Sequence, residues 1–158
     1  MAKTDKTNVM RILDQKKIEY TVHDYLQSGM VSGEDVAQVL GEKPDEVFKT
    51  LVTVGKSKQN YVFLVPVCKE LNLKKAANAV GEKNIEMIKS KDLLWLTGYI
   101  HGGCSPVGMK KVFTTVVDCS AQSKEKIFFS AGKIGYQVEI AVKDIEKVIK
   151  YKFFDICD

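Results

Sequence analysis

Apolar residues recur at two different spacings near the start of the chain. Val9, Ile12 and Leu13 follow a three-four spacing, which predicts a helix with one apolar face over residues 5–17. Residues 18–23 then alternate between apolar and polar side chains, and a period of two is typical of a strand. The chain is therefore expected to begin with a helix that leads directly into a strand.

Capping residues and turn residues divide the next part of the chain. Ser32 is a candidate N-cap followed by acidic residues, and Gly41 is a candidate stop, so a helix is predicted between them. Residues 47–54 and 60–67 are rich in β-branched and aromatic side chains, which favours strands. The polar segment Gly55–Gln59 between them is predicted to be the loop of a hairpin.

The second half of the chain mixes helical and strand-like patterns. Helices are predicted over residues 73–80, 92–96 and 143–151, and strands over residues 112–118, 126–130 and 136–142. Several connections are too short for parallel crossovers, so the expected fold class is mixed α/β, with a largely antiparallel sheet and helices packed around it. No repeat or linker interrupts the pattern, so residues 1–158 are expected to form a single domain.

The charge of the chain is weakly basic, and it comes almost entirely from lysine. The sequence has 24 Lys and Arg residues against 20 Asp and Glu, a net charge of +4, and Arg11 is the only arginine. Lysine contacts phosphate as a point charge and lacks the bidentate geometry of arginine. A nucleic-acid partner is therefore permitted, with contacts to the phosphate backbone that weaken as salt rises.

Neither the apolar segments nor the cysteines indicate secretion or membrane insertion. No window approaches the apolar length that spans a bilayer, and the first residues lead into an amphipathic pattern instead of a signal peptide. Cys68, Cys104, Cys119 and Cys157 are scattered along the chain, which predicts free thiols. The protein is therefore expected to be cytoplasmic.

Several common catalytic motifs are missing from the sequence. The chain has two histidines, His23 and His101, and no nucleophile elbow of the G-x-S-x-G type. Its histidines and cysteines lack zinc-ligand spacing, and neither a Walker A motif nor a G-x-G-x-x-G run occurs. Serine hydrolase, zinc hydrolase, kinase, P-loop NTPase and dehydrogenase chemistry are therefore disfavoured.

Lys49 is the first candidate for a functional side chain. It lies near the start of the predicted strand 47–54, where a period of two places it on the same face as Leu51 and Thr53. On this pattern alone, a lysine on a solvated face is the favoured interpretation. The alternative is a cation that lines a pocket, where it holds a phosphate or polarises a carbonyl group.

A glycine-rich loop is the second candidate. Residues 97–108 contain four glycines and a proline, and such a loop lets backbone N–H groups approach a ligand closely, although a structural turn explains it equally well. Lys110 and Lys111 follow at once and suit a phosphate-bearing ligand, or are plain surface charge. His101 and Cys104 raise the alternative of a thiol nucleophile, but their spacing within a glycine-rich loop does not specify the geometry that it needs.

Short motifs in a fixed order extend along almost the whole chain. They are Ile18-Glu19-Tyr20 with His23 and Tyr25, Val47-Phe48-Lys49-Thr50-Leu51-Val52, residues 71–77, Thr97-Gly98-Tyr99 with Gly102-Gly103, Ser105-Pro106, Gly108 and Lys110-Lys111, Ser130-Ala131-Gly132-Lys133 with Gly135, and Glu139 with Asp144. Together they resemble the YbaK/EbsC group of free-standing Cys-tRNA(Pro) deacylases, which is related to the editing domain inserted in bacterial prolyl-tRNA synthetases. With this resemblance, the pocket interpretation of Lys49 becomes the favoured one.

The resemblance implies a mixed α/β domain with a barrel-like sheet and one pocket. The family's essential lysine maps onto Lys49, and its substrate-facing loop backbone maps onto Gly102 and Gly103, so these three residues are expected to be catalytic. The expected substrate-binding residues are Tyr25, Thr50, Ser105, Ser130 and Gln137, and the expected tRNA-binding residues are Lys110, Lys111 and Lys133.

The resemblance also implies a reaction without metal, cofactor or enzyme nucleophile. The expected substrate is mischarged Cys-tRNA(Pro), with Cys-tRNA(Cys) as a further candidate, and the expected protein partner is prolyl-tRNA synthetase. The thiol of the substrate attacks its own ester carbonyl, which releases tRNA and a cyclic thiolactone, and the closeness of thiol and ester favours the step. The protein then needs only to orient the ester and stabilise the developing oxyanion.

Three positions depart from the family pattern. Gln137 stands where many relatives carry an acidic residue linked to the pocket, so the amino-acid preference stays open. Ile134 stands where a basic residue is frequent, which is expected to weaken a tRNA contact. Cys104 stands where an aliphatic residue is common, and an inward-facing thiol is expected to make the pocket sensitive to oxidation.

Two other functions stay open at this point. Deacylation of Ala-tRNA(Pro) or another small aminoacyl-tRNA is a close alternative, because one methylene in a pocket is worth only about 1–3 kcal/mol of discrimination. A non-catalytic protein that binds tRNA or a nucleotide is an alternative of another class. The presence of Lys49 within its motif argues against this last alternative.

Overall fold

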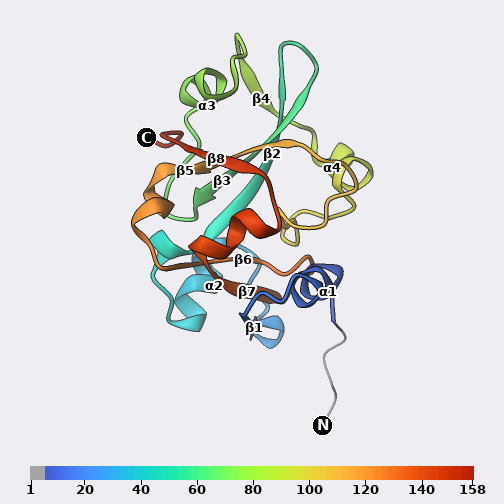
Figure 1. Cartoon of the computed structure of the whole chain (residues 1–158), viewed down its shortest axis with the longest axis vertical. Helices are drawn as coiled ribbons and strands as arrows, with labels where there is room; N and C mark the ends of the chain where they lie inside the picture. Colours follow the sequence, from blue (N-terminus) through green and yellow to red (C-terminus); the bar gives the residue numbers. More distant parts are fainter. Residues whose placement is uncertain (1–5) are drawn as a thin grey trace.

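Two open β-sheets form the framework of the computed structural model, which describes residues 6–158 (Figure 1). The larger sheet has the strand order β4-β2-β3-β5-β8, and the smaller has the order β1-β7-β6. The larger sheet consists of β2 Phe48–Gly55, β3 Asn60–Pro66, β4 Ile85–Met87, β5 Thr114–Asp118 and β8 Tyr151–Phe154. The smaller consists of β1 Tyr20–Asp24, β6 Lys126–Ser130 and β7 Tyr136–Ala141, which lie together at the lower end of the view.

Most of the strands pair antiparallel, as predicted. The pairs β1–β7, β6–β7, β2–β3 and β2–β4 are antiparallel, whereas β3–β5 and β5–β8 are parallel. The two sheets meet where Val47, just before β2, forms an isolated bridge with Phe128 of β6. Because both sheets are open, the term barrel-like describes the fold only loosely.

The predicted hairpin is confirmed, and its second strand is the most deeply buried strand of the protein. β2 and β3 pair in register from Phe48↔Pro66 to Val54↔Asn60, with the connecting turn closed by a hydrogen bond from the Gly55 N–H to the Gln59 carbonyl. Along β3, Val62 and Leu64 face one hydrophobic cluster and Phe63 and Val65 face another. A strand covered on both faces carries a continuous apolar run, which explains the lack of alternation here.

The main hydrophobic cluster joins the two sheets. It contains residues of the larger sheet such as Phe48 and Val117 and residues of the smaller sheet such as Phe129 and Ile140. A second cluster lies between the larger sheet and the helix α3, Leu73–Val80. No helix among residues 6–158 combines the length and the apolar character needed to span a membrane.

Three of the other predicted helices also form. They are α1 Asn8–Gln15, α2 Gly33–Leu40 and α4 Ser90–Thr97. Asp5, where the first helix was predicted to begin, lies outside the described residues. Gly41 ends α2 in the left-handed conformation at φ 69°, as a C-cap glycine does. Ser32 occupies the predicted N-cap position, but its side chain makes no capping hydrogen bond.

The predicted closing helix over residues 143–151 is wrong. Residues Val142–Lys147 form a 3-10 helix, and the chain then enters the edge strand β8 beside β5. β8 places Tyr151 and Phe153 against the main hydrophobic cluster, where their rings pack edge to face with centroids 5.2 Å apart. Burial of these two aromatic side chains outweighs the helical spacing that suggested one continuous helix.

Candidate functional site

A pocket of about 460 Å³ opens where the two sheets meet. One wall is Val47 to Leu51 at the start of β2, and another is Val31, Ser32, Gly33 and Val36 around the start of α2. The remaining walls are Tyr25, Phe129, Ser130 and Gln137 of the smaller sheet and its flanks, and Leu93, His101, Gly102 and Cys104 from α4 and the glycine-rich loop. The pocket thus collects segments that lie far apart in the sequence, from Tyr25 to Gln137.

The structure brings six of the eleven predicted site residues to this pocket. These six residues are Tyr25, Lys49, Thr50, Gly102, Ser130 and Gln137. The other five, which are Gly103, Ser105, Lys110, Lys111 and Lys133, lie outside its lining. The predicted substrate-binding and catalytic residues therefore gather more closely than the predicted tRNA-binding residues do.

Lys49 brings a cation to the mouth of the pocket. Its Nζ lies 3.7 Å from Oε1 of Glu70, a residue whose side chain is 83% exposed, whereas the Lys49 side chain is 30% exposed. An ion pair at that distance with a solvated partner contributes little free energy. The ammonium group of Lys49 is therefore available to an anionic or polarised group of a ligand.

Two polar atoms in the pocket lining lack partners. Among residues 6–158, neither Thr50 Oγ1 nor Gln137 Oε1 has a hydrogen-bond partner, and both atoms are buried. Proteins rarely leave a buried polar atom unpaired, because each one costs about 1–3 kcal/mol. Because Thr50 and Gln137 both line the pocket, these two atoms are candidates for a hydrogen bond with a ligand or water.

Tyr25 and Ser130 both line the pocket. The Tyr25 N–H donates to the Gly135 carbonyl at 2.8 Å, which ties the tyrosine to the turn between β6 and β7. Burial raises the pKa of the Tyr25 hydroxyl, so it stays protonated at neutral pH. Ser130 Oγ accepts the Gly132 N–H at 3.1 Å, which leaves the hydroxyl hydrogen for a ligand.

The two glycines of the predicted catalytic loop differ in the hydrogen bonds of their backbone N–H groups. The Gly103 N–H donates to the Ile100 carbonyl at 2.9 Å, whereas the Gly102 N–H makes no backbone hydrogen bond among residues 6–158. A Cβ on Gly103 would lie 3.1 Å from the Ile134 backbone nitrogen, so this glycine permits close packing of two loops. Gly102 is therefore the better source of a backbone donor.

The remaining predicted residues lie around this site. Ser105 is fully buried, and its Oγ accepts the Val107 N–H at 3.3 Å, which is a role within the loop. Lys110 and Lys111 are exposed on the same loop, with Lys111 Nζ 5.8 Å from the centre of the Trp95 ring. Lys133 is exposed on the β6–β7 turn, 5.4 Å from the centre of the Tyr136 ring.

Cys104 lines the pocket in a form that does not favour nucleophilic attack. Burial raises the pKa of its thiol to about 12, although a hydrogen bond with Thr97 acts in the other direction. The thiolate is the reactive form of cysteine, so a thiol with such a pKa is a poor nucleophile at neutral pH. This disfavours the Cys104 and His101 pair as a catalytic unit.

Sequence patterns missed the apolar walls of the pocket. Val31, Val36, Val67 and Leu93 line it, and nothing in their local pattern separates them from core residues. The structure also shows where Ile134, which departs from the family pattern, is located. A Cβ on Gly102 would lie 3.5 Å from the Ile134 side chain. Ile134 therefore packs against a glycine of the pocket lining.

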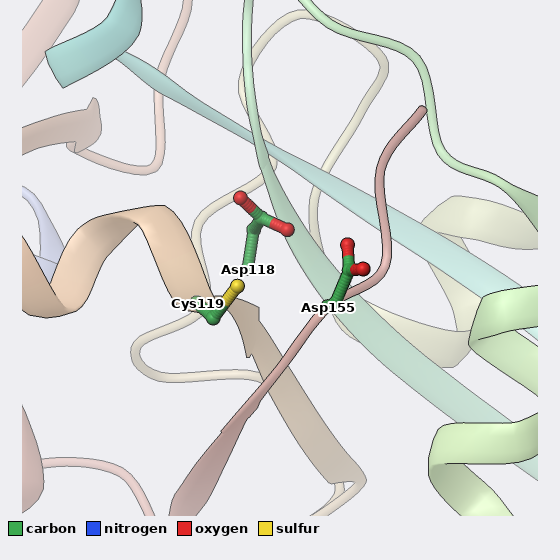
Figure 2. Close-up of side chains that lie close together, drawn as sticks. All are labelled: Asp118, Cys119 and Asp155. Carbon is green, nitrogen blue, oxygen red and sulfur yellow. The ribbon is translucent and has the colours of Figure 1, made fainter.

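A second cluster of polar side chains lies away from the pocket. Asp118, Cys119 and Asp155 place potential metal-ligand atoms within 4.8 Å of one another, where the segments that leave β5 and β8 come together (Figure 2). Their sequence separation gave no sign of this cluster. The Asp118 oxygens already accept the N–H groups of Ser120 at 3.2 Å and Ile156 at 3.3 Å, so the cluster supports the local backbone.

Known sequences resemble this chain over most of its length. The model of the aminoacyl-tRNA editing domain matches residues 28–148. A protein of Enterococcus faecalis, described as a candidate Cys-tRNA(Pro)/Cys-tRNA(Cys) deacylase EbsC, is 45% identical over 152 residues, which are 96% of this chain and 93% of that protein. A proline–tRNA ligase of Shouchella clausii is 31% identical over 103 residues, which are 65% of this chain and 18% of the ligase.

Solved structures show the same fold. The crystal structure of a candidate trans-editing enzyme for prolyl-tRNA synthetase superimposes with a TM-score of 0.82, at 21% identity, over 96% of this chain and 98% of that one. A hypothetical protein superimposes with a TM-score of 0.83, at 20% identity, over 95% and 99% of the two chains. The sequence match over residues 28–148 and the near full-length relative together show that this chain belongs to the aminoacyl-tRNA editing-domain family.

Proposed function

We propose that this chain is a trans-editing deacylase that removes cysteine from mischarged Cys-tRNA(Pro), with residues 1–158 acting as one domain. The observation that carries the proposal is that Lys49, Gly102, Thr50 and Gln137 line one pocket, where Thr50 Oγ1 and Gln137 Oε1 lack hydrogen-bond partners and the Gly102 N–H makes no backbone hydrogen bond among residues 6–158. The near full-length similarity to the Enterococcus faecalis protein supports the same reaction class.

The pocket residues suit an ester whose carbonyl is polarised but not attacked by the protein. The ammonium of Lys49 attracts the negative charge that develops on the carbonyl oxygen, and the Gly102 N–H donates to the same oxygen. The substrate's thiol sulfur then forms a bond to the carbonyl carbon while the bond from that carbon to the ribose oxygen breaks. The thiol proton passes to the ribose oxygen, so the products are tRNA and a cysteine thiolactone.

The selectivity of the pocket is expected to be mainly steric. Val31, Val36 and Val67 narrow it with branched apolar side chains. One extra methylene in such a pocket changes binding by only about 1–3 kcal/mol, so small aminoacyl groups compete with cysteinyl. Only a substrate with its own nucleophile uses the internal reaction, and this distinguishes cysteinyl from alanyl substrates.

A panel of substrates tests the proposal. We expect the protein to deacylate cysteinyl-tRNA(Pro) faster than alanyl-, seryl- or prolyl-tRNA(Pro), with cysteinyl-tRNA(Cys) included to measure tRNA selection. Lys49→Ala is expected to lower the rate by at least about 100-fold. Lys74→Ala, which changes an exposed lysine on α3, is the matched control. Deacylation of none of these substrates, or an active Lys49→Ala protein, would refute the proposal.

We also propose that prolyl-tRNA synthetase supplies part of the tRNA selection. The supporting observation is that three predicted tRNA-binding lysines lie outside the pocket on a chain whose net charge is only +4. A surface this weakly charged gives phosphate contacts without base recognition. Addition of the synthetase is expected to raise the preference for tRNA(Pro) over tRNA(Cys), and an unchanged ratio would remove this part of the proposal.

A further inference from the structure

Glu42 is a partly exposed residue whose carboxylate oxygens are buried, and the proposed reaction does not use it. It follows Gly41, the C-cap of α2, and its N–H donates to the Ala37 carbonyl at 2.9 Å. Among residues 6–158, neither carboxylate oxygen of Glu42 has a hydrogen-bond partner, and both are shielded from solvent. A shielded carboxylate without a donor is costly, so its retention requires an explanation.

One of the groups near Glu42 is not already engaged by another residue among residues 6–158 and can interact with its carboxylate. The charged groups that act on it are His23 of β1, Glu139 of β7 and Lys126 of β6. His23 Nε2 lies 2.8 Å from Glu139 Oε1, and Lys126 Nζ lies 3.1 Å from Glu139 Oε2, so both of these side chains are engaged by Glu139. The remaining neighbour is the side-chain amide of Gln137.

Gln137 connects this acid to the pocket. Its side chain is in the pocket lining, the residue is 4% exposed, and its Oε1 has no partner among residues 6–158. Glu42 is not part of the lining. Glu42 is thus near a residue of the lining without lining the pocket itself, and both side chains carry oxygen atoms without a hydrogen-bond partner among the described residues.

We propose that Glu42 is a positioning residue that sets the orientation of the Gln137 amide and thereby the affinity of the pocket for the substrate's amino group. The inference rests on the proposed function, because an aminoacyl ester carries a free α-ammonium group next to the reacting carbonyl. With Glu42 ionised, the amide turns its N–H groups toward the carboxylate and its oxygen toward the ammonium. With Glu42 protonated, the acid donates to Gln137 Oε1, and the amide N–H groups face the ammonium instead.

The electrostatics of the site agree with this arrangement. Burial raises the pKa of Glu42 above its ordinary 4.5, while the nearby side-chain amide of Gln137 acts in the opposite direction. The carboxyl group therefore changes charge closer to neutral pH than an exposed glutamate does. An amide held by an ionised carboxylate also carries more negative potential on its oxygen, which favours a cation.

Mutation of Glu42 is expected to raise the stability of the protein and to weaken the binding of the substrate. Glu42→Gln removes a buried carboxylate, so the free energy of unfolding at neutral pH is expected to rise. The same change is expected to raise KM for cysteinyl-tRNA(Pro) about tenfold while kcat changes little, because a charge-assisted contact to the bound amino group is lost. A residue with a merely structural role would lose stability and activity together.

The decisive experiment measures KM, kcat and stability from about pH 5 to about pH 8. In the unmodified protein, KM is expected to rise as the pH falls through the raised pKa of Glu42, and in Glu42→Gln this rise is expected to disappear. Glu86→Gln, a change of an exposed glutamate on β4, is the matched control and should follow the unmodified profile. The exchange Glu42→Gln with Gln137→Glu moves the carboxylate into the lining and is expected to restore a low KM.

The outcomes distinguish this inference from the proposed function. If the unmodified protein deacylates cysteinyl-tRNA(Pro) and Glu42→Gln has the same KM and the same pH profile, the inference is wrong and the function stands. A Glu42→Gln protein that is less stable at neutral pH and loses kcat would likewise overturn it. If the unmodified protein deacylates none of the substrates, the proposed function and this inference both fail.

Discussion

His23 Nε2 lies 2.8 Å from Glu139 Oε1, and the pair links the neighbouring strands β1 and β7 beside the pocket. Lys126 Nζ reaches the other oxygen of Glu139 at 3.1 Å. Burial alone would raise the pKa of Glu139, but the hydrogen bonds from His23 and Lys126 hold it below its ordinary 4.5. The carboxylate of Glu139 therefore accepts hydrogen bonds, whereas the carboxylate of Glu42 accepts none within the part of the chain that the structure describes.

The first prediction concerns the stability that Glu139 contributes. A carboxylate with a lowered pKa stabilises the folded state above its ordinary pKa, and this contribution is lost as the pH falls through the lowered value. Glu139→Gln is therefore expected to lower the free energy of unfolding by about 1 kcal/mol at neutral pH and to have no effect at strongly acid pH. Urea unfolding at several pH values measures this. A difference that does not change with pH would contradict it.

The second prediction concerns the space beside Gly102. This glycine has φ 86°, and a Cβ added to it would lie 2.7 Å from Val31 Cγ1. Gly102→Ala is therefore expected to cost backbone strain of about 1 kcal/mol and, in addition, to displace the pocket wall and reduce deacylation by at least about tenfold. Melting curves and initial rates test both effects.

Gly29→Ala provides a matched control for this change. Gly29 has φ 72°, and a Cβ there would meet no atom within 4 Å. Its substitution is expected to cost the same backbone strain without reducing the rate. Equal losses of activity in the two variants would show that the effect at Gly102 is one of backbone strain alone.

The third prediction concerns thiol reactivity. Because burial raises the pKa of Cys104 to about 12, its thiolate fraction at neutral pH is small. Iodoacetamide is therefore expected to modify the exposed Cys68 well before Cys104, as followed by mass spectrometry of peptides. Faster labelling at Cys104 would reopen the nucleophile alternative and the expected sensitivity of the pocket to oxidation.

The fourth prediction concerns tRNA contacts outside the pocket. Lys110→Ala and Lys111→Ala are each expected to raise KM for aminoacyl-tRNA and to lower the slope of log KM against log salt by about 1, since each removes one phosphate contact. kcat should stay nearly constant. Lys83→Ala, which changes an exposed lysine after α3, is the comparison variant. Identical salt slopes in all three variants would remove these lysines from the interface.

Local sequence signals were sufficient for most elements of the fold. The hairpin of β2 and β3 and the helix α3 were predicted closely because β-branched runs, turn residues and a glycine stop agree with one another there. The edge strand β8 was missed because its apolar spacing also suits a helix, and only its pairing with β5 decides between the two. The three-residue strand β4 is too short to leave a pattern.

Parts of the candidate site could be proposed from the sequence, because some of its residue types are unusual at their positions. A charge in an apolar run and a cluster of glycines made Lys49 and the loop glycines candidates, but the pattern alone favoured a solvated lysine, and the family resemblance was needed to favour the pocket. Gly102 and Gly103 could not be separated, since which N–H is already bonded depends on the fold of the loop. Glu42 gave no signal, because an acid after a helix ordinarily points into solvent.

The pairing of β8 also has a consequence for how the protein is made. β8 completes the larger sheet beside β5, the Asn72 N–H at the start of α3 donates to the Ile156 carbonyl at 2.8 Å, and Leu71 forms a bridge with Cys157. A nascent chain therefore cannot finish this sheet until residues 151–157 have left the ribosome. The partly made protein must reach that point with the edge of β5 unpaired, which makes it a candidate substrate for chaperones.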